Sequence, residues 1–232
     1  MEEKKIHRIV CGPLGVNTFV VPVGDGKAFV VDPAGCKMDT VDELVVNKFL
    51  RENGLDPVLI VLTHGHFDHI FAVPALSAEF PGAKLAIHKN DAMMIGEAGS
   101  EYQANHLARF GYGSLKYLPL VSNIREPDVL LAEGMTLAEC VPEMGGEASE
   151  NLAKWRVMHT PGHTPGGICL YNEPDDMIIT GDTIFFRAVG RTDMPGGDER
   201  LLECSIGRIL TDIKDSTLMY PGHDRIAFTK KD

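Results

Sequence analysis

The sequence has few cysteines, and none of them stands in a C-x-x-C pair. An odd number of cysteines scattered along a chain argues against a disulfide framework and favours a reducing compartment. None lies in a recognisable context for a thiol nucleophile, so we expect small buried hydrophobic residues. The five are Cys11, Cys36, Cys140, Cys169 and Cys204.

The sequence also lacks any long run of basic residues. Its longest runs are Lys4-Lys5 and Lys230-Lys231, and 33 acidic against 22 basic residues give a formal net charge of −11. A chain this acidic repels a phosphodiester backbone. We therefore expect no nucleic-acid partner, and a nuclease is disfavoured.

Long apolar runs are absent too. The opening segment Met1–Lys5 carries mixed charge, and no long apolar segment follows it. This predicts neither a secretory signal nor a transmembrane span, so we expect a cytoplasmic protein without a membrane partner. No repeat, low-complexity tract or linker divides the 232 residues. Residues 1–232 are therefore predicted to form a single domain.

Two common catalytic signatures are missing: the G-x-S-x-G elbow of serine hydrolases and the phosphate-binding G-x-x-x-x-G-K loop. The chain carries instead a dense group of metal-binding side chains. His64, His66, Asp68 and His69 directly follow the apolar run Val58–Leu62. Imidazole nitrogen and ionised carboxylate are preferred donors for ions such as Zn²⁺. Side chains this close together indicate a cation between them.

Three more donors lie further along the chain, each next to a glycine: His163, Asp182 and His223. Seven donors are enough for two divalent metal ions, with Zn²⁺ expected first and Fe or Mn as alternatives. His64 and His66 are two residues apart in a chain that leaves a strand, so both side chains can point to one side. They are predicted to hold one ion, which His163 would complete.

The second ion is expected beside the first. Asp68 and His69 fall at the following turn, where side chains change direction, and His223 would complete their ion. Asp182 has two carboxylate oxygens and can bridge the ions, which in two-metal hydrolytic sites lie about 3.5–4 Å apart. A water between two such ions becomes acidic and supplies hydroxide. Metal-assisted hydrolysis is thus the leading class of chemistry, with Asp68 and Asp182 as the predicted catalytic residues.

The order of apolar segments predicts an α/β fold. It fits a four-layer αβ/βα sandwich, in which two mixed β-sheets pack face to face with helices on the outer faces. We expect insertions at about 96–119, forming short helices over a cleft, and at about 143–151, forming a flexible segment. Asp91 is predicted to cap a helix. Predicted strands cover residues 6–10, 17–23, 27–32, 58–62, 85–88, 137–141, 155–159, 167–171, 177–180 and 217–220, and predicted helices cover about 39–53, 70–80 and 201–210.

Four separated motifs, in this order, resemble those of the metallo-β-lactamase superfamily. The resemblance implies the αβ/βα fold. It also implies a first metal held by His64, His66, His163 and Asp182, and a second held by Asp68, His69, Asp182 and His223. The motifs are Thr63–His69, Thr160-Pro-Gly-His-Thr164, Thr180-Gly-Asp-Thr-Ile-Phe185 and Pro221-Gly-His223.

Within that superfamily, the length and residues 181–197 look like the short glyoxalase II-like thioesterases. This resemblance implies hydrolysis of a small-molecule thioester such as S-D-lactoylglutathione. Arg191 stands where classical glyoxalase II has a lysine that contacts the glutathione carboxylate, and it keeps the charge. Asp193 replaces an expected tyrosine. No separate C-terminal helical domain is expected after His223.

A persulfide dioxygenase with one iron resembles this chain in the same motifs and is the rival from another class. Metal analysis separates the two, since the hydrolase is expected to hold about two ions. A lactamase is less favoured, because Asp182 stands where several such enzymes carry cysteine. His106 and Arg109 are predicted to lie on a solvated helix face, with a position facing the substrate as the alternative.

Overall fold

The computed structural model describes residues 6–232, and the opening Met1–Lys5 with its Lys4-Lys5 pair lies outside the described residues. Its larger sheet has six strands in the order β1-β2-β3-β4-β5-β6. The pairs β3/β4, β4/β5 and β5/β6 are parallel, and β1/β2 and β2/β3 are antiparallel. The strands are β1 (His7–Cys11), β2 (Val16–Gly24), β3 (Lys27–Val31), β4 (Asp56–Leu62), β5 (Lys84–His88) and β6 (Val129–Leu131).

The second sheet has four strands in the order β12-β9-β8-β7, with β12 and β9 parallel and the other pairs antiparallel. A separate two-stranded hairpin joins β10 to β11. Its turn follows Asp182 closely in the chain. The strands are β7 (Trp155–His159), β8 (Ile168–Asn172), β9 (Met177–Gly181), β10 (Ile184–Phe185), β11 (Ala188–Val189) and β12 (Leu218–Pro221).

Alternate residues of the strands face the two sides of each sheet, because side chains in a strand alternate with a period of two. In β3, Phe29 and Val31 pack against residues of the second sheet, whereas Val30 packs under the helices outside the first sheet. In β9, Ile179 faces the first sheet and Ile178 faces the outer helix. Both sheets are therefore apolar on both faces, which requires an outer layer of helices.

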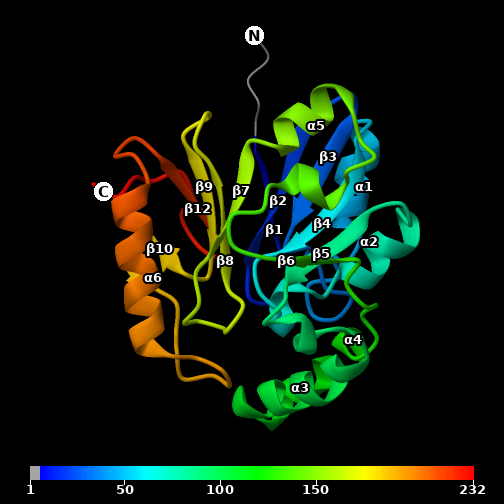
Figure 1. The fold of residues 1–232 in the computed structure, drawn as a ribbon. Coiled ribbons are helices and arrows are strands. Elements are labelled where there is room, and N and C mark those ends of the chain that lie inside the picture. Colours follow the sequence, from blue (N-terminus) through cyan, green and yellow to red (C-terminus); the bar gives the residue numbers. More distant parts are fainter. Residues whose placement is uncertain (1–5) are drawn as a thin grey trace.

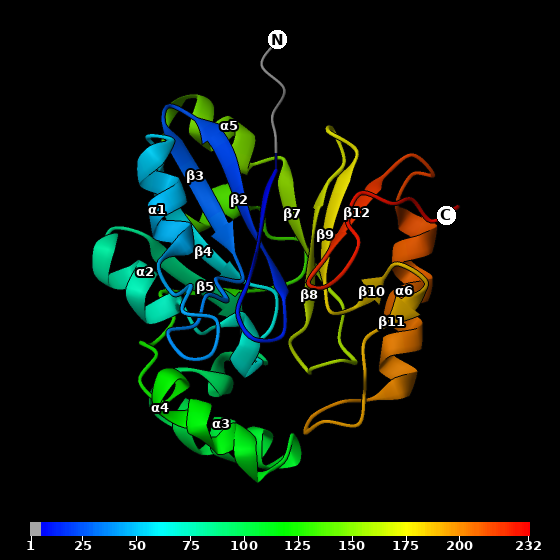
Figure 2. The same cartoon turned by 180° about the vertical axis from the view of Figure 1, so that it is seen from behind.

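Helices supply those outer layers. Figure 1 shows α1 and α2 outside the first sheet and α6 outside the second, and Figure 2 shows the same layers from behind. The predicted four-layer αβ/βα sandwich is confirmed. The helices are α1 (Val45–Glu52), α2 (Val73–Glu79), α3 (Gly96–Arg109), α4 (Leu118–Val121), α5 (Gly146–Leu152) and α6 (Glu199–Asp212), and the 3₁₀ turns are η1 (Phe67–His69), η2 (Ala92–Met94), η3 (Tyr112–Tyr117) and η4 (Leu137–Cys140).

Two predicted segments are wrong in type. The predicted strand at 137–141 is instead the 3₁₀ turn η4 (Leu137–Cys140), because Thr136 and Glu139 make a reciprocal capping box that starts a helical turn. Residues 143–151 are no flexible insertion, since most of them belong to α5. Its Ala148 and Leu152 are buried in the core between the sheets, and Asn151 donates to the carbonyl of Val23 at 2.8 Å.

Helix boundaries also differ from the prediction. The helix expected from about residue 39 begins at Val45. The Asp42 carboxylate instead accepts from the amides of Gly12 and Cys36, at 2.9 and 2.7 Å, which ties this segment to the strand ends as a loop. The region 96–119 does form helices, of which α3 is the longest. Within residues 6–232, none of the helices has the length and apolar character needed to cross a membrane.

The packing between the sheets predicts the effect of one substitution. Phe29 is fully buried and meets the Trp155 ring of the opposite sheet edge-on, with ring centroids 5.3 Å apart. We expect Phe29→Ala to lower the free energy of unfolding by about 3–5 kcal/mol, because it leaves a cavity. Chemical denaturation measures this change. Leu44→Ala, at a side chain 53% exposed, is the control and should change it by less than about 0.5 kcal/mol. Equal effects of the two variants would contradict the prediction.

Candidate metal centre

The seven predicted donors come together at one edge of the sandwich, where several strands end. His64, His66, Asp68 and His69 follow β4, and the latter two belong to η1. The other three donors follow β7, β9 and β12, one after each strand: His163, Asp182 and His223. Loops at strand ends are held by the rigid sheets, and so donors remote in sequence can meet.

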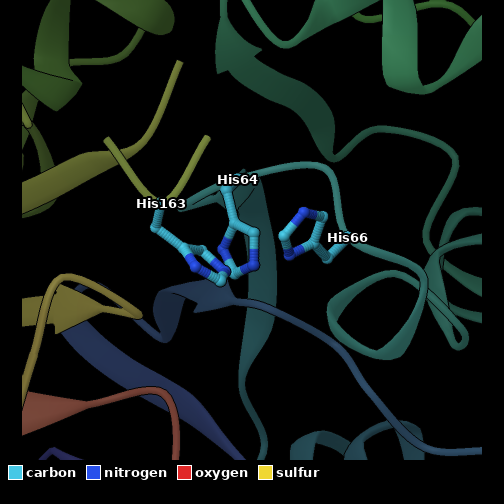
Figure 3. Close-up of side chains that lie close together, drawn as sticks. All are labelled: His64, His66 and His163. Atoms are coloured by element: carbon cyan, nitrogen blue, oxygen red, sulfur yellow. The ribbon is translucent and has the colours of Figure 1, made fainter. Parts of the chain in front are cut away.

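His64, His66 and His163 form what we call the first donor group. Figure 3 shows their three imidazoles pointing toward one another. Their potential ligand atoms all lie within 4.8 Å of one another. The Nε2 atom of each ring is buried and has no hydrogen-bond partner. A buried polar atom without a partner is unfavourable, and three such atoms facing one another fit a bound cation.

Asp68, His69 and His223 form the second donor group. The Nε2 atoms of His69 and His223 lie 3.3 Å apart, and Asp68 Oδ2 lies 3.6 and 3.4 Å from them. A tetrahedron with metal–ligand bonds of about 2.1 Å has edges of about 3.4 Å. The spacing of these donors therefore matches the spacing required around one divalent ion.

Asp182 lies between the two donor groups. One carboxylate oxygen, Oδ2, is 3.6 Å from His163 Nε2 and 3.5 Å from His223 Nε2, and Oδ1 is 3.5 Å from His69 Nε2. Oδ1 is buried and has no hydrogen-bond partner. A side chain at Gly222 would place its Cβ 2.3 Å from Oδ1, so only glycine leaves room here. The carboxylate is thus positioned to reach an ion in either group.

Contacts behind the donors fix the orientation of their rings. His69 Nδ1 lies 2.9 Å from Asp32 Oδ2, and His163 Nδ1 lies 2.7 Å from the carbonyl of Arg191. Each ring donates its Nδ1 proton outward, which leaves Nε2 free for a metal. Asp32 also accepts from the backbone amide of Thr63 at 2.7 Å and from its hydroxyl at 2.6 Å. One buried carboxylate therefore holds both the start of the His cluster and one donor.

The electrostatics of the second donor group are those of a cation site. Burial opposes protonation of His69, but Asp182, Asp68 and Asp32 together raise its pKa well above the usual range. Burial likewise opposes protonation of His223, but Asp182 and Asp68 raise its pKa to about 9. The protons on these two rings therefore supply positive charge at the positions where divalent ions would supply it.

Two rings of the first donor group, those of His64 and His66, are already neutral. Burial lowers the pKa of His64 and of His66 well below the usual range, and the neighbouring imidazoles lower both further. Neutral imidazoles are the form that binds metal. The residues present therefore fit two divalent ions, one at each donor group.

Arg191, the predicted substrate-binding residue, lies next to this centre. Its carbonyl holds His163, and its side chain makes a bidentate pair with Asp193 at 2.6 and 2.7 Å. The guanidinium also lies over the ring of Phe110, 5.2 Å from the ring centroid. The charge of Arg191 is thus already partnered by a carboxylate of the same loop.

One sequence prediction near the site is wrong. His106 was expected on a solvated helix face, but it is fully buried against His66, with ring centroids 4.1 Å apart. Both of its ring nitrogens lack a hydrogen-bond partner. Burial lowers the pKa of His106 to about 4. Arg109, predicted on the same face, is exposed. The helix α3 thus covers the first donor group with one side and meets solvent with the other.

Three positions near the site had another sequence interpretation or none. Asp32 was predicted only as a strand end, and Asp91 was predicted to cap a helix but makes no side-chain cap. Instead Asp91 is buried and accepts from Gly65, Thr164 and Gly166. Gln103, also buried, donates to the carbonyl of Gly65 at 2.7 Å. The role of Asp32 was predictable from the sequence, because Asp32 directly follows β3. That strand runs parallel to β4, which precedes the His cluster.

The family of the chain follows from comparison with known proteins. Residues 11–223 match the model of the metallo-beta-lactamase superfamily. The chain therefore belongs to that superfamily, as its motifs predicted. It is 28% identical over 219 residues to the probable metallo-hydrolase YqgX of Bacillus subtilis, covering 94% of this chain and 90% of YqgX. It is 27% identical over 198 residues to the hydroxyacylglutathione hydrolase GloC of Haemophilus influenzae, covering 85% and 80%.

Solved structures of similar fold agree. The B3 metallo-beta-lactamase BLEG-1 superposes with a TM-score of 0.76 at 27% identity, covering 96% of this chain and 93% of that one. TTHA1623 in a di-iron-bound form gives 0.74 at 28% identity, with 97% and 94% covered. ETHE1 from Myxococcus xanthus gives 0.66 at 21% identity, with 97% and 79% covered, and shares the fold. Membership of this superfamily supports a metal-binding hydrolase.

The raised pKa of His223 leads to a prediction for metal binding. Its pKa of about 9 in the metal-free protein means that the ring is protonated at pH 7. A ligating imidazole must be neutral, so Zn²⁺ has to displace that proton. We expect Zn²⁺ affinity to rise as the pH rises towards about 9, with protons released on binding at pH 7.

Calorimetric titration with Zn²⁺ in two buffers of different ionisation enthalpy measures the protons released. His223→Ala should release about one proton fewer, because the displaced proton is absent. Zn²⁺ binding that releases no protons and is independent of pH would contradict this account of the second donor group.

Proposed function

We propose that the protein is a two-metal hydrolase of acyl-thioesters, of the glyoxalase II-like kind, with S-D-lactoylglutathione or a related thioester as substrate. The observation that carries the proposal is Asp182, whose carboxylate lies within 3.6 Å of donors in both groups. Two sites joined in this way fit hydrolysis with two ions. The relative named a hydroxyacylglutathione hydrolase supports the thioester class.

The residues have separate roles in this proposal. The first donor group would hold one ion, the second donor group the other, and Asp182 would contact both. When bound, the ions lower the pKa of a water and polarise the thioester carbonyl. Asp68 points its Oδ2 at the Nε2 atoms of His69 and His223, at 3.6 and 3.4 Å. Its carboxylate would orient the attacking water, whose acidity the ions would supply.

The cysteines do not compete for the role of nucleophile. Burial raises the pKa of Cys11 and of Cys169 to about 11, so both thiols stay protonated at neutral pH. The thiolate is the reactive form of cysteine. The exposed Cys204 lies in α6, on the outer layer of the second sheet. This supports direct attack by water over a covalent route.

Arg191 is the residue proposed to bind a carboxylate of the thiol carrier. Its carbonyl accepts from His163, and its side chain is about half exposed, so a substrate can reach the guanidinium. A guanidinium and a carboxylate can form two parallel hydrogen bonds. Asp193 occupies that face in the free protein. The substrate would therefore compete with Asp193 for Arg191.

A second candidate activity is the mononuclear-iron persulfide dioxygenase that the motifs of the chain also resemble. The complete second donor group favours the hydrolase, since a single ion at the first donor group would leave Asp68 and His223 without a metal. A relative of known structure was solved with two irons, which supports a two-metal site.

The function is tested with protein purified without chelator. We expect about two ions per chain by elemental analysis, and hydrolysis of S-D-lactoylglutathione that strong chelator abolishes. A panel of thioesters with other acyl groups and thiols defines the substrate class. One iron per chain with oxygen uptake on glutathione persulfide would instead establish the dioxygenase.

Asp182→Ala tests the bridging carboxylate. Losing a partner behind a metal ligand already costs about 10–100-fold, so loss of a ligand to both ions should lower kcat/KM by about a hundredfold or more. Thioester hydrolysis and bound metal are measured together. Asp212→Ala, at an exposed carboxylate of α6, is the matched control and should retain full activity. Normal turnover of Asp182→Ala with both ions bound would remove Asp182 from the mechanism.

Arg191 and Asp193 make a pair of opposite predictions. Arg191→Ala should raise KM for a glutathione thioester by about tenfold and change kcat little, since a charge-assisted hydrogen bond is lost in substrate and transition state alike. Asp193→Asn should lower KM, because it frees the guanidinium. Steady-state kinetics with glutathione and carboxylate-free thioesters separate these effects. An Arg191→Ala variant with unchanged KM for both substrates would show that Arg191 does not bind the carboxylate.

A further inference from the structure

A buried carboxylate outside the predicted donors joins the two loops that carry the first donor group. Asp91 follows β5 and is fully buried. Its Oδ2 accepts from the amide of Gly65 at 3.3 Å and from the hydroxyl of Thr164 at 2.6 Å, and its Oδ1 accepts from the amide of Gly166 at 2.5 Å. Gly65 lies between His64 and His66, and Thr164 directly follows His163. The carboxylate therefore bridges ligands about a hundred residues apart in sequence.

The backbone of Gly65 is held at its carbonyl as well as at its amide. The side-chain amide of Gln103, in α3, donates to the Gly65 carbonyl at 2.7 Å and to the Met94 carbonyl at 2.8 Å. A Cβ at position 65 would lie 2.5 Å from the Cβ of Met94. Asp91 thus holds the His64–Gly65 peptide by its N–H and Gln103 holds the Gly65–His66 peptide by its carbonyl, which orients the backbone on both sides of Gly65.

The loop that carries His163 and the strand before it are also held by the last residue of β5 and the residues that follow it. The ring of His88 stacks on that of His159, with centroids 4.0 Å apart and planes 12° apart. Asn90 donates to the carbonyl of Pro165 at 3.3 Å. A Cβ at Gly166 would lie 2.6 Å from Asp91 Oδ1, so the close approach requires glycine. Residues 88–91 thus clamp the His163 loop onto the first sheet.

The second donor group has no such contact with Asp91. Its His69 is held by Asp32, which also binds Thr63. Asp32 therefore stands behind His69 and the start of the His cluster, whereas Asp91 contacts only the loops of the first donor group. Contacts of this kind orient ligands and commonly set metal affinity.

We infer that Asp91 is a positioning residue that sets the affinity of the first donor group for its metal ion. The inference rests on the proposed two-metal function. Asn at this position cannot replace the carboxylate, because its amide would present hydrogen atoms to at least one donor. With Oδ1 kept on Gly166, the side-chain amide nitrogen of Asn would face the Gly65 N–H and repel it. The His64–Gly65 peptide would then lose the contact that orients it.

The test measures Zn²⁺ affinity at each site by competition with a chromophoric chelator. His66→Ala and His223→Ala identify which binding step belongs to the first donor group and which to the second. In Asp91→Asn we expect the affinity of the first step to fall by about 10–100-fold, with the second step unchanged.

Asp128→Asn is the matched control. Asp128 also uses a carboxylate to accept from a backbone amide, that of Leu85 within β5 at 2.7 Å, and pairs with Arg125, but it touches neither metal-binding loop. It should lower the melting temperature and leave both binding steps unchanged. If Asp91→Asn lowers the melting temperature but weakens neither step, or weakens both equally, Asp91 is only structural and the inference fails.

A milder variant covers the case in which Asp91→Asn does not fold. Thr164→Val removes one hydrogen bond to Asp91 and keeps the shape of the side chain, so the first step should weaken by about fivefold. An unchanged first step in Thr164→Val would count against the inference. Failure of the proposed function appears separately, as a wild-type protein that binds two ions but hydrolyses no thioester. A wild-type protein that binds no metal would overturn both proposals.

Discussion

Buried negative charge that must be balanced is the constraint on which this structure depends. Asp32, Asp68 and Asp182 converge on His69 in the interior, and Asp182 also reaches His223. Carboxylates away from water are unfavourable unless paired. In the metal-free protein the pairing is made by protons, as the raised pKa values of the two imidazoles indicate. The same positions fit divalent ions, which in the proposed function would supply the positive charge in place of the protons.

The sandwich provides the rigidity that this exchange requires. Loops from both sheets contribute donors at the same edge, and two carboxylates that follow strands of the first sheet lie behind them. Asp32 directly follows β3 and Asp91 follows β5, on either side of β4, from which the His cluster extends. The strand with the most ligands is therefore flanked by the two residues that orient them. Apolar packing on both faces of the sheets keeps these three strand ends in register.

The sequence predicted the donors far better than the contacts that hold them. His64, His66, Asp68 and His69 are dense enough in the chain to indicate a metal, and the glycine turns indicate the remaining three. Asp91, in contrast, has the local appearance of a helix cap, because the groups that it accepts from are about 25 and 75 residues away. The burial of His106 was likewise not predictable from the local sequence, because only the tertiary fold turns its side of α3 toward His66.

The fold class and most strands were predictable, because two-sided apolar segments between turns suit only a few architectures. Errors came where local chemistry outweighed hydrophobic pattern, as at Thr136, whose capping box converts an apolar segment into a 3₁₀ turn. The short hairpin β10–β11 and the edge strand β6 gave no clear pattern, since strands of two or three residues are too short to show a period.

The backbone and the side chain of Arg191 have different contacts. The carbonyl orients a donor imidazole, whereas the guanidinium faces the loop surface and pairs with Asp193. Any residue supplies the carbonyl, whereas in the proposed function only the side chain would select the bound molecule. A substitution of this side chain would then change which molecule is recognised, while the His163 ring keeps its tautomer and its place.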